Sequence, residues 1–208
     1  MLKNKWFRFS LVLFLIPLIL ITMTYNQLPA QIATHFGVNG EPNGYMSKFM
    51  GLYGTWLFIL VLHVFCSFMT LKDPKRENIP NIGIRIVFMI CPVICLLLDL
   101  VIIGYSLGYK FNVGIVVNVA VGLLFVILGN YLPKVKRNYT FGIRTSWALD
   151  DQENWNKTNR IGGYCFVIAG MLYIVLGMFN YMFIGICVII IACLIPCVYS
   201  YKLYKAGL

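Results

Sequence analysis

Long apolar runs separated by short polar intervals extend along most of the chain. Four of these runs carry at most one charged side chain, and they occupy residues 9–25, 49–71, 86–105 and 113–131. About 20 apolar residues are needed to cross the hydrocarbon core of a bilayer. Each of these runs therefore predicts one membrane-spanning segment.

The last apolar run is about twice as long as one crossing requires. Residues 161–201 contain no charged side chain over 41 positions. The polar break at residues 179–181 predicts a tight turn, and hence a helical hairpin over residues 162–200 with spans at 162–178 and 182–200. Isolated strands would leave backbone groups unpaired in lipid, so all six spans are predicted to be helices. The predicted fold class is an all-α polytopic membrane protein.

The composition excludes a soluble domain. Mean hydropathy is +0.81, with 60% hydrophobic and 12% charged residues, which leaves too little polar surface to cover the apolar volume. We therefore expect a single membrane domain over residues 1–208. The seven cysteines lie in apolar runs, and their odd number beside two histidines indicates neither a disulfide framework nor a metal site. No cofactor is expected.

The basic residues indicate how the chain is oriented. Fifteen of the seventeen Lys and Arg residues fall on one side of the predicted membrane, and only Lys48 and Lys110 fall on the other. Cytoplasmic loops carry the excess of Lys and Arg. Both termini and the polar loop at residues 129–163 are therefore predicted to be cytoplasmic, and the loop at residues 26–48 extracellular. Topology explains the net charge of +10, so no direct nucleic-acid binding is expected.

Residues 9–71 comprise the first two spans and the predicted extracellular loop. No small-x-small cleavage pattern follows the first apolar run, which favours a retained helix over a signal peptide. Within the loop, Asn39-Gly40 and Asn43-Gly44 predict successive tight turns, because Asn and Gly tolerate positive φ.

This outer loop carries one histidine and two charged side chains, which are His35, Glu41 and Lys48. They do not supply a nucleophile, a base and an orienting group, which argues against catalysis. Contact with an extracellular ligand and simple folding of the loop are equally supported alternatives.

Residues 129–163 form the longest polar interval of the chain. Near Asn130 and Pro133, the basic residues Lys134, Lys136 and Arg137 suffice as an anchor for anionic lipid. The tetrapeptide Gly142-Ile143-Arg144-Thr145 that follows is turn-like, and its arginine is able to make a forked contact.

The spacing Asp150-x-x-Glu153 predicts a capped helix leading into the fifth span. On that helix Trp155, Thr158 and Asn159 share one face, and Trp147 precedes the cap. Anchoring of the tryptophans at the membrane interface and docking of a cytoplasmic partner are the two alternatives. Physical chemistry alone favours anchoring.

The candidate functional side chains inside the predicted spans are His63, Asp99 and Asn118. Burying a charged Asp costs about 2.5–3.5 kcal/mol or more, which makes Asp99 a functional candidate; a neutral, hydrogen-bonded or water-accessible carboxyl is the alternative. Asn118 is more typical of hydrogen bonding between helices than of ligand binding. A small ion-coupled transporter using these residues is the alternative function, although no internal repeat supports it.

The loop at residues 129–163 resembles the signature of the SdpI family, the immunity proteins against a secreted sporulation-delay peptide toxin. The positions that carry this resemblance are Asn130, Pro133, Asn138, Gly142 to Thr145, Trp147, Glu153 to Trp155, Lys157, Thr158 and Gly163. The outer loop resembles a small membrane-associated domain of unknown function, DUF1648, through Leu28-Pro29, His35-Phe36, Gly40, Gly44 and Lys48. Phe36 and Asn159 depart from the Trp and the His that are common at these positions.

The resemblance implies a multi-pass bacterial cell-membrane protein, not an enzyme, that protects its producer from the toxin. In the founding system it further implies recruitment of a small ArsR-type autorepressor to the membrane by the toxin-engaged protein. The candidates for toxin contact are His35, Phe36, Glu41 and Lys48. The candidates for the cytoplasmic signature and partner contact are Asn130, Pro133, Asn138, Gly142, Arg144, Thr145, Trp147, Trp155 and Thr158. With the resemblance, docking through Arg144, Trp147 and Trp155 ranks above anchoring.

Overall fold

The computed structural model describes residues 1–37 and 40–208. Within those residues, six helical segments are long and apolar enough to cross a membrane. Their bounds are Lys5–Gln27, Met50–Leu71, Asn81–Ser106, Val113–Lys134, Gln152–Met178 and Met182–Lys205. The mostly helical architecture and the positions of the predicted spans are confirmed.

The described chain forms two compact units. The first comprises Met1–Leu71 and Ile84–Val113, and the second comprises Lys72–Gly83 and Gly114–Leu208. The polar linker after α3 (Thr55–Leu71) therefore packs within the second unit. Its two ends nevertheless continue into α3 and α4 (Asn81–Ser106), which lie wholly or mainly in the first unit.

The first span is broken in its middle. It consists of α1 (Lys5–Leu13) and α2 (Leu15–Thr24), which meet at Phe14. Pro17 lacks the amide hydrogen that would donate to the carbonyl oxygen of Leu13, so the helical hydrogen-bond ladder is interrupted there. At the break, the carbonyl oxygen of Phe14 accepts a 3.0 Å hydrogen bond from the indole nitrogen of Trp56. The break is therefore tied to α3.

In the chain, a β-hairpin lies between the first two spans. The prediction of an all-α fold is therefore wrong in this segment. β1 (Gln31–Phe36) and β2 (Pro42–Ser47) pair antiparallel, with irregular register on both sides of His35. The turn predicted at Asn43-Gly44 is also wrong, because both residues lie within β2. A Cβ at Gly44 would lie 2.9 Å from Cβ of His35, so glycine is needed for this close pairing. Asn39, from the other predicted turn, lies outside the described residues.

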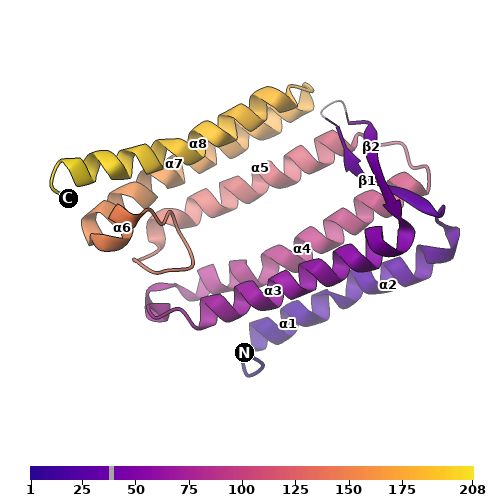
Figure 1. Cartoon of the computed structure of the whole chain (residues 1–208), viewed down its shortest axis with the longest axis horizontal. Helices are drawn as coiled ribbons and strands as arrows, with labels where there is room; N and C mark the ends of the chain where they lie inside the picture. The colour runs from indigo at the N-terminus through magenta and orange to yellow at the C-terminus, as the bar shows by residue number, and fades with distance from the viewer. Residues whose placement is uncertain (38–39) are drawn as a thin grey trace. The chain divides into compact units, whose positions relative to one another are not determined.

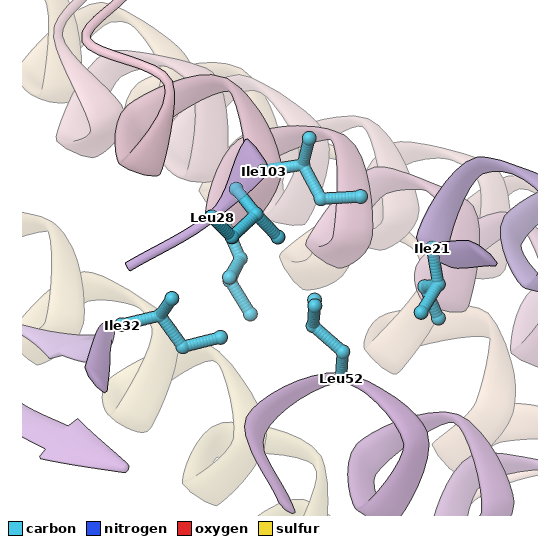
Figure 2. Close-up of a cluster of buried hydrophobic side chains, with 6 residues drawn as sticks. Ile21, Leu28, Ile32, Leu52 and Ile103 are labelled. Atoms are coloured by element: carbon cyan, nitrogen blue, oxygen red, sulfur yellow. The ribbon is translucent and has the colours of Figure 1, made fainter. Parts of the chain in front are cut away.

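The hairpin packs on the helix ends of the first unit through β1. Ile32 lies in a buried cluster with Ile21, Leu28, Leu52, Ile102 and Ile103, shown in Figure 2. Leu52 belongs to η2 (Met50–Gly54), a π-helical turn that opens the second span. A Cβ at Gly51 would lie 2.8 Å from Cδ1 of Ile32. A small residue at the start of this span therefore lets the strand approach closely.

In the second unit, α5 (Val113–Tyr131) and α7 (Gln152–Met178) cross with their backbones in contact. A Cβ at Gly122 would lie 2.6 Å from the carbonyl oxygen of Gly170. A Cβ at Gly129 would lie 2.8 Å from the carbonyl oxygen of Gly163. Small residues at such crossings allow the close packing on which helix association in lipid depends.

The predicted turn at residues 179–181 is confirmed. α7 ends at Met178, and α8 (Met182–Lys205) returns beside it (Figure 1). Asn180 takes a φ of 61°, a left-handed conformation that asparagine adopts more readily than most residues. α7 begins ten residues before the predicted start of the fifth span at residue 162. The second part of the polar loop is therefore a continuous extension of the spanning helix.

Candidate functional site

The site is built on the connection between α5 and α7, residues 132–151, here called the central segment. It contains η4 (Leu132–Lys134) and the short helix α6 (Ser146–Asp150). Its signature residue Asn138 is fully buried. The side-chain oxygen of Asn138 accepts from the amides of Thr140 (2.9 Å) and Phe141 (2.7 Å), while its nitrogen donates to the carbonyl oxygens of Lys136 and Phe141 at 2.9 Å. The Asn138 side chain thus fixes a bend of the backbone over residues 136–141.

Trp155 and Asn159 of α7 hold the two ends of that bend. The indole nitrogen of Trp155 donates to the carbonyl oxygen of Val135 at 2.7 Å. The side chain of Asn159 accepts from the amide of Ile143 at 2.8 Å and donates to the carbonyl oxygen of the same residue at 3.4 Å. Gly142 has a φ of +128°, and a Cβ there would lie 2.9 Å from the Trp155 ring. We call Asn138, Gly142, Trp155 and Asn159 the frame. Within it, Trp155 and Asn159 leave no room for a side chain at position 142.

A second buried network joins α6, α7 and α8. The Thr145 hydroxyl caps α6 by accepting from the amide of Ala148 at 3.2 Å, and it lies 2.6 Å from Oγ of Ser200. Ser200 donates to Oδ1 of Asn154 at 2.7 Å, and Thr158 donates to the same oxygen at 3.0 Å. The amide nitrogen of the Asn154 side chain donates to the Ser200 carbonyl oxygen at 3.0 Å. Thr145 and Thr158 are thus parts of one hydrogen-bonded junction.

The capping prediction is off by one residue. Asp151, and not Asp150, is the N-cap of α7, and its carboxylate accepts from the amide of Asn154 at 2.6 Å. Asp150 instead ends α6, where its carbonyl oxygen accepts from the guanidinium of Arg137 at 2.5 Å. Arg137 also donates to the carbonyl oxygen of Leu149 at 3.2 Å. A cation at a helix C-terminus is favoured by the carbonyl groups exposed there, so Arg137 is more than a lipid anchor.

The exposed face of the central segment is smaller than predicted. Trp155 and Thr158 are 0% exposed, so they form neither an interface anchor nor part of a partner surface in this structure. Arg144 and Tyr139 are among the exposed side chains of the central segment, and a guanidinium nitrogen of Arg144 donates to the Tyr139 carbonyl oxygen. Trp147 is half-buried.

The remaining signature candidates lie around this face. The Trp147 ring lies 5.0 Å from that of Tyr201 between centroids. Asn130 and Pro133 are exposed, and a Cβ at Gly163 would lie 2.7 Å from Cγ of Pro133. Pro133 therefore packs on α7 at the point where the central segment begins.

Sequence reasoning missed Asp73, in the linker between α3 and α4. Asp73 is 6% exposed. One carboxylate oxygen accepts from the amide of Lys75 at 2.8 Å, and the other accepts from the amide of Tyr139 at 2.9 Å and from the hydroxyl of Thr140. Asn78 of the same linker donates to the carbonyl oxygen of Arg137 at 2.6 Å. Asp73-Pro74 is a typical turn sequence, but nothing in the sequence indicates its distant partners.

The four outer-loop candidates differ in their surroundings. Lys48 donates to the carbonyl oxygens of Tyr25 (3.0 Å) and Leu28 (3.1 Å), which gives it a structural role. Phe36 packs edge-on against Tyr105 with ring centroids 5.0 Å apart. His35 is exposed and lies 2.5 Å from the side-chain oxygen of Asn43. Glu41 is exposed immediately before β2.

Two of the intramembrane candidates, His63 and Asp99, lie in the first unit. Nε2 of His63 lies 2.9 Å from the Ser10 hydroxyl, and its ring stacks on Phe7 at 5.5 Å between centroids. One oxygen of Asp99 accepts from the Cys95 thiol at 3.6 Å, and the other has no hydrogen-bond partner among the described residues. His63 and Asp99 therefore occupy separate environments.

Asn118 lies in the second unit, on α5. It is buried, and a Cβ at Gly177 would lie 2.5 Å from its Cβ. Its side-chain oxygen has no hydrogen-bond partner within residues 1–37 and 40–208. Asn118 therefore packs against α7 where a glycine makes room.

Within residues 1–37 and 40–208, no three or more His, Cys, Asp or Glu side chains are grouped so that they could hold a metal ion.

Comparison with known proteins finds two family models and one curated relative that this chain resembles. Residues 134–200 match the SdpI/YfhL protein family, and residues 12–61 match the domain of unknown function DUF1648. The immunity protein SdpI of Bacillus subtilis (strain 168) is 24% identical over 202 residues, which cover 94% of each chain. No solved structure matches the chain significantly. The chain of this multi-pass membrane protein is therefore similar to the SdpI/YfhL family over residues 134–200, which include most of the central segment, and to DUF1648 over residues 12–61.

Proposed function

We propose that the protein is a membrane immunity protein that protects the bacterium producing it from a secreted peptide toxin. The observation that carries this proposal is the match to an immunity protein over 94% of both chains. The buried frame around Asn138 and Trp155 supports the proposal, since it gives the matched region an ordered, hydrogen-bonded structure outside the apolar part of the helices.

The distribution of charge supports one orientation of the protein in the membrane. The basic residues concentrate at the two termini, in the α3–α4 linker and in the polar loop at 129–163, and by the positive-inside rule this distribution supports a cytoplasmic location for these parts. The β-hairpin then lies at the outer surface. A peptide in the medium would meet the hairpin first, with His35 and Glu41 exposed on it.

Binding, and not catalysis, is the proposed mechanism. A toxin captured at the outer surface favours one conformation of the protein over another, which is the requirement for a ligand to change the state of a distant segment. On the inside, Arg144 and Tyr139 are exposed on the central segment. We propose them, with Trp147, as the surface that recruits a small cytoplasmic autorepressor.

Survival of a toxin-sensitive bacterium tests the proposed function. Cells with and without the protein are challenged with sporulation-delay peptide, and we expect the protein to raise survival. Variants Arg144→Ala and Lys136→Ala are compared at matched membrane abundance, because both remove an exposed basic side chain from the same segment. Equal killing with and without the wild-type protein would refute immunity against this toxin.

The two variants then separate protection from signalling. If Arg144 only recruits a repressor, Arg144→Ala protects as well as Lys136→Ala, and expression of a reporter under the autorepressor is no longer induced by the toxin. If Arg144 serves protection itself, Arg144→Ala cells die at the rate of cells that lack the protein.

A further inference from the structure

The α3–α4 linker, residues 72–80, contains Asp73, whose carboxylate is hydrogen-bonded to the central segment. Asp73 lies 66 positions before Tyr139 in the sequence, yet its carboxylate accepts from the amide of Tyr139 at 2.9 Å and from the hydroxyl of Thr140. Neither matched region, at residues 12–61 and 134–200, includes Asp73. Hydrogen bonds to an ionised acceptor are stronger than those between neutral groups.

The same linker makes two further contacts with the central segment. The side chain of Asn78 donates to the carbonyl oxygen of Arg137 at 2.6 Å, and the ammonium group of Lys75 lies 5.4 Å from the centroid of the Tyr139 ring. Asp73 and Asn78 thus hold the peptide backbone on both sides of Asn138, while Lys75 contacts the Tyr139 ring. We call these three linker residues the clasp.

Asp73 of the clasp is connected to the exposed Arg144 through the backbone of Tyr139. Asp73 fixes the amide of Tyr139, and the carbonyl oxygen of Tyr139 accepts from the guanidinium of Arg144. An arginine on the surface loses much side-chain entropy when it is held in one position. The Tyr139 carbonyl oxygen can hold Arg144 only while the backbone at residue 139 stays in place.

We propose that Asp73 is a positioning residue that sets the presentation of Arg144, and that the linker passes a displacement of α3 or α4 on to the central segment. The covalent path is short, because nine residues separate the end of α3 at Leu71 from the start of α4 at Asn81. The proposed transmission rests on the proposed function, whereas the positioning of Arg144 does not.

Tryptic cleavage after Arg144 in the detergent-solubilised full-length protein tests the positioning without any toxin. The rate is measured by mass spectrometry relative to cleavage after Lys205, near the end of α8. Asp73→Ala is expected to raise the relative rate about tenfold, which corresponds to about 1.4 kcal/mol of local opening. Glu77→Ala is the matched control, because it removes an exposed carboxylate from the same linker. It is expected to leave the rate unchanged.

Two milder variants keep this test decisive if Asp73→Ala does not accumulate in the membrane. Asp73→Asn retains one acceptor oxygen, and Thr140→Val removes only the hydroxyl donor. Both are expected to be cleaved after Arg144 faster than wild type. Cleavage of the accumulating Asp73 variants at the wild-type rate would overturn the proposal.

A double-mutant comparison in the survival assay tests whether Asp73 acts through Arg144. If it does, Asp73→Ala with Arg144→Ala impairs protection or reporter induction no more than Arg144→Ala alone. Additive losses would overturn the action through Arg144. If the wild-type protein gives no protection, the proposed function fails, while the cleavage rates still decide the positioning role of Asp73.

Discussion

The indole nitrogen of Trp155 donates a 2.7 Å hydrogen bond to the carbonyl oxygen of Val135, which joins α7 to the beginning of the central segment. Both residues are buried. A tryptophan next to a membrane span is usually an interface anchor, but this one is an internal support. Its ring also forms the surface against which Gly142 packs.

Trp155→Phe is expected to destabilise the protein by about 1–3 kcal/mol, because it leaves the buried Val135 carbonyl oxygen without its donor. Thermal unfolding in detergent micelles measures the effect as a lower midpoint. Trp147→Phe is the control, since the Trp147 ring is half-buried against Tyr201 and no hydrogen bond of its indole supports a buried group among the described contacts. Equal midpoints for the two variants would contradict the supporting role of Trp155.

Gly142→Ala is expected to disturb the central segment more than Gly108→Ala. Both glycines have positive φ, at +128° and +84°, so both substitutions impose backbone strain of about 1–3 kcal/mol. A Cβ at Gly142 would also lie 2.9 Å from the Trp155 ring, whereas nothing lies within 4 Å of one at Gly108. Unfolding midpoints and cleavage after Arg144 measure the difference. A larger loss of stability in Gly108→Ala would show that the contact with Trp155 does not restrict position 142.

Ser200→Ala is expected to cost about 1–3 kcal/mol of stability, because it removes a donor to Asn154 and a partner of Thr145 in a buried network. Ser146→Ala is the control, since Ser146 is exposed at the start of α6. Chemical unfolding in mixed micelles is a suitable measurement. A Ser200→Ala protein as stable as Ser146→Ala would mean that water replaces the lost hydroxyl.

The spans could be predicted from the sequence because length and charge decide them. Charged residues are too costly in hydrocarbon to occur by chance, so the uncharged runs coincide with the helices, and Asn180 marks the turn between the last two. The start of α7 could not be predicted in the same way. Apart from Trp155, its first nine residues are polar, and they are helical because Trp155 and Asn159 pack under the central segment.

The β-hairpin and the buried networks depend on contacts that are distant in the sequence. β1 is held by Ile32 packing on Leu52, which no local propensity indicates. The partners of Asp73 and Asn154 lie 67 and 46 positions away at Thr140 and Ser200. A polar residue in a short loop or near the end of a helix is usually solvated, so only the structure reveals that these side chains are buried.

Asp99→Asn separates immunity from the alternative of an ion-coupled transporter. Asp99 is fully buried, and one of its oxygens accepts from the Cys95 thiol at 3.6 Å. Asparagine has nearly the same shape and keeps an acceptor for that thiol, but it cannot carry a proton or a charge. If the protein acts by binding, Asp99→Asn is therefore expected to protect cells as well as wild type does, at equal abundance in the membrane.

Survival under toxin challenge is the measurement, with His35→Ala as a companion variant on the outer hairpin. Loss of protection in Asp99→Asn with full protection in His35→Ala would instead favour a mechanism that moves ions through the first unit.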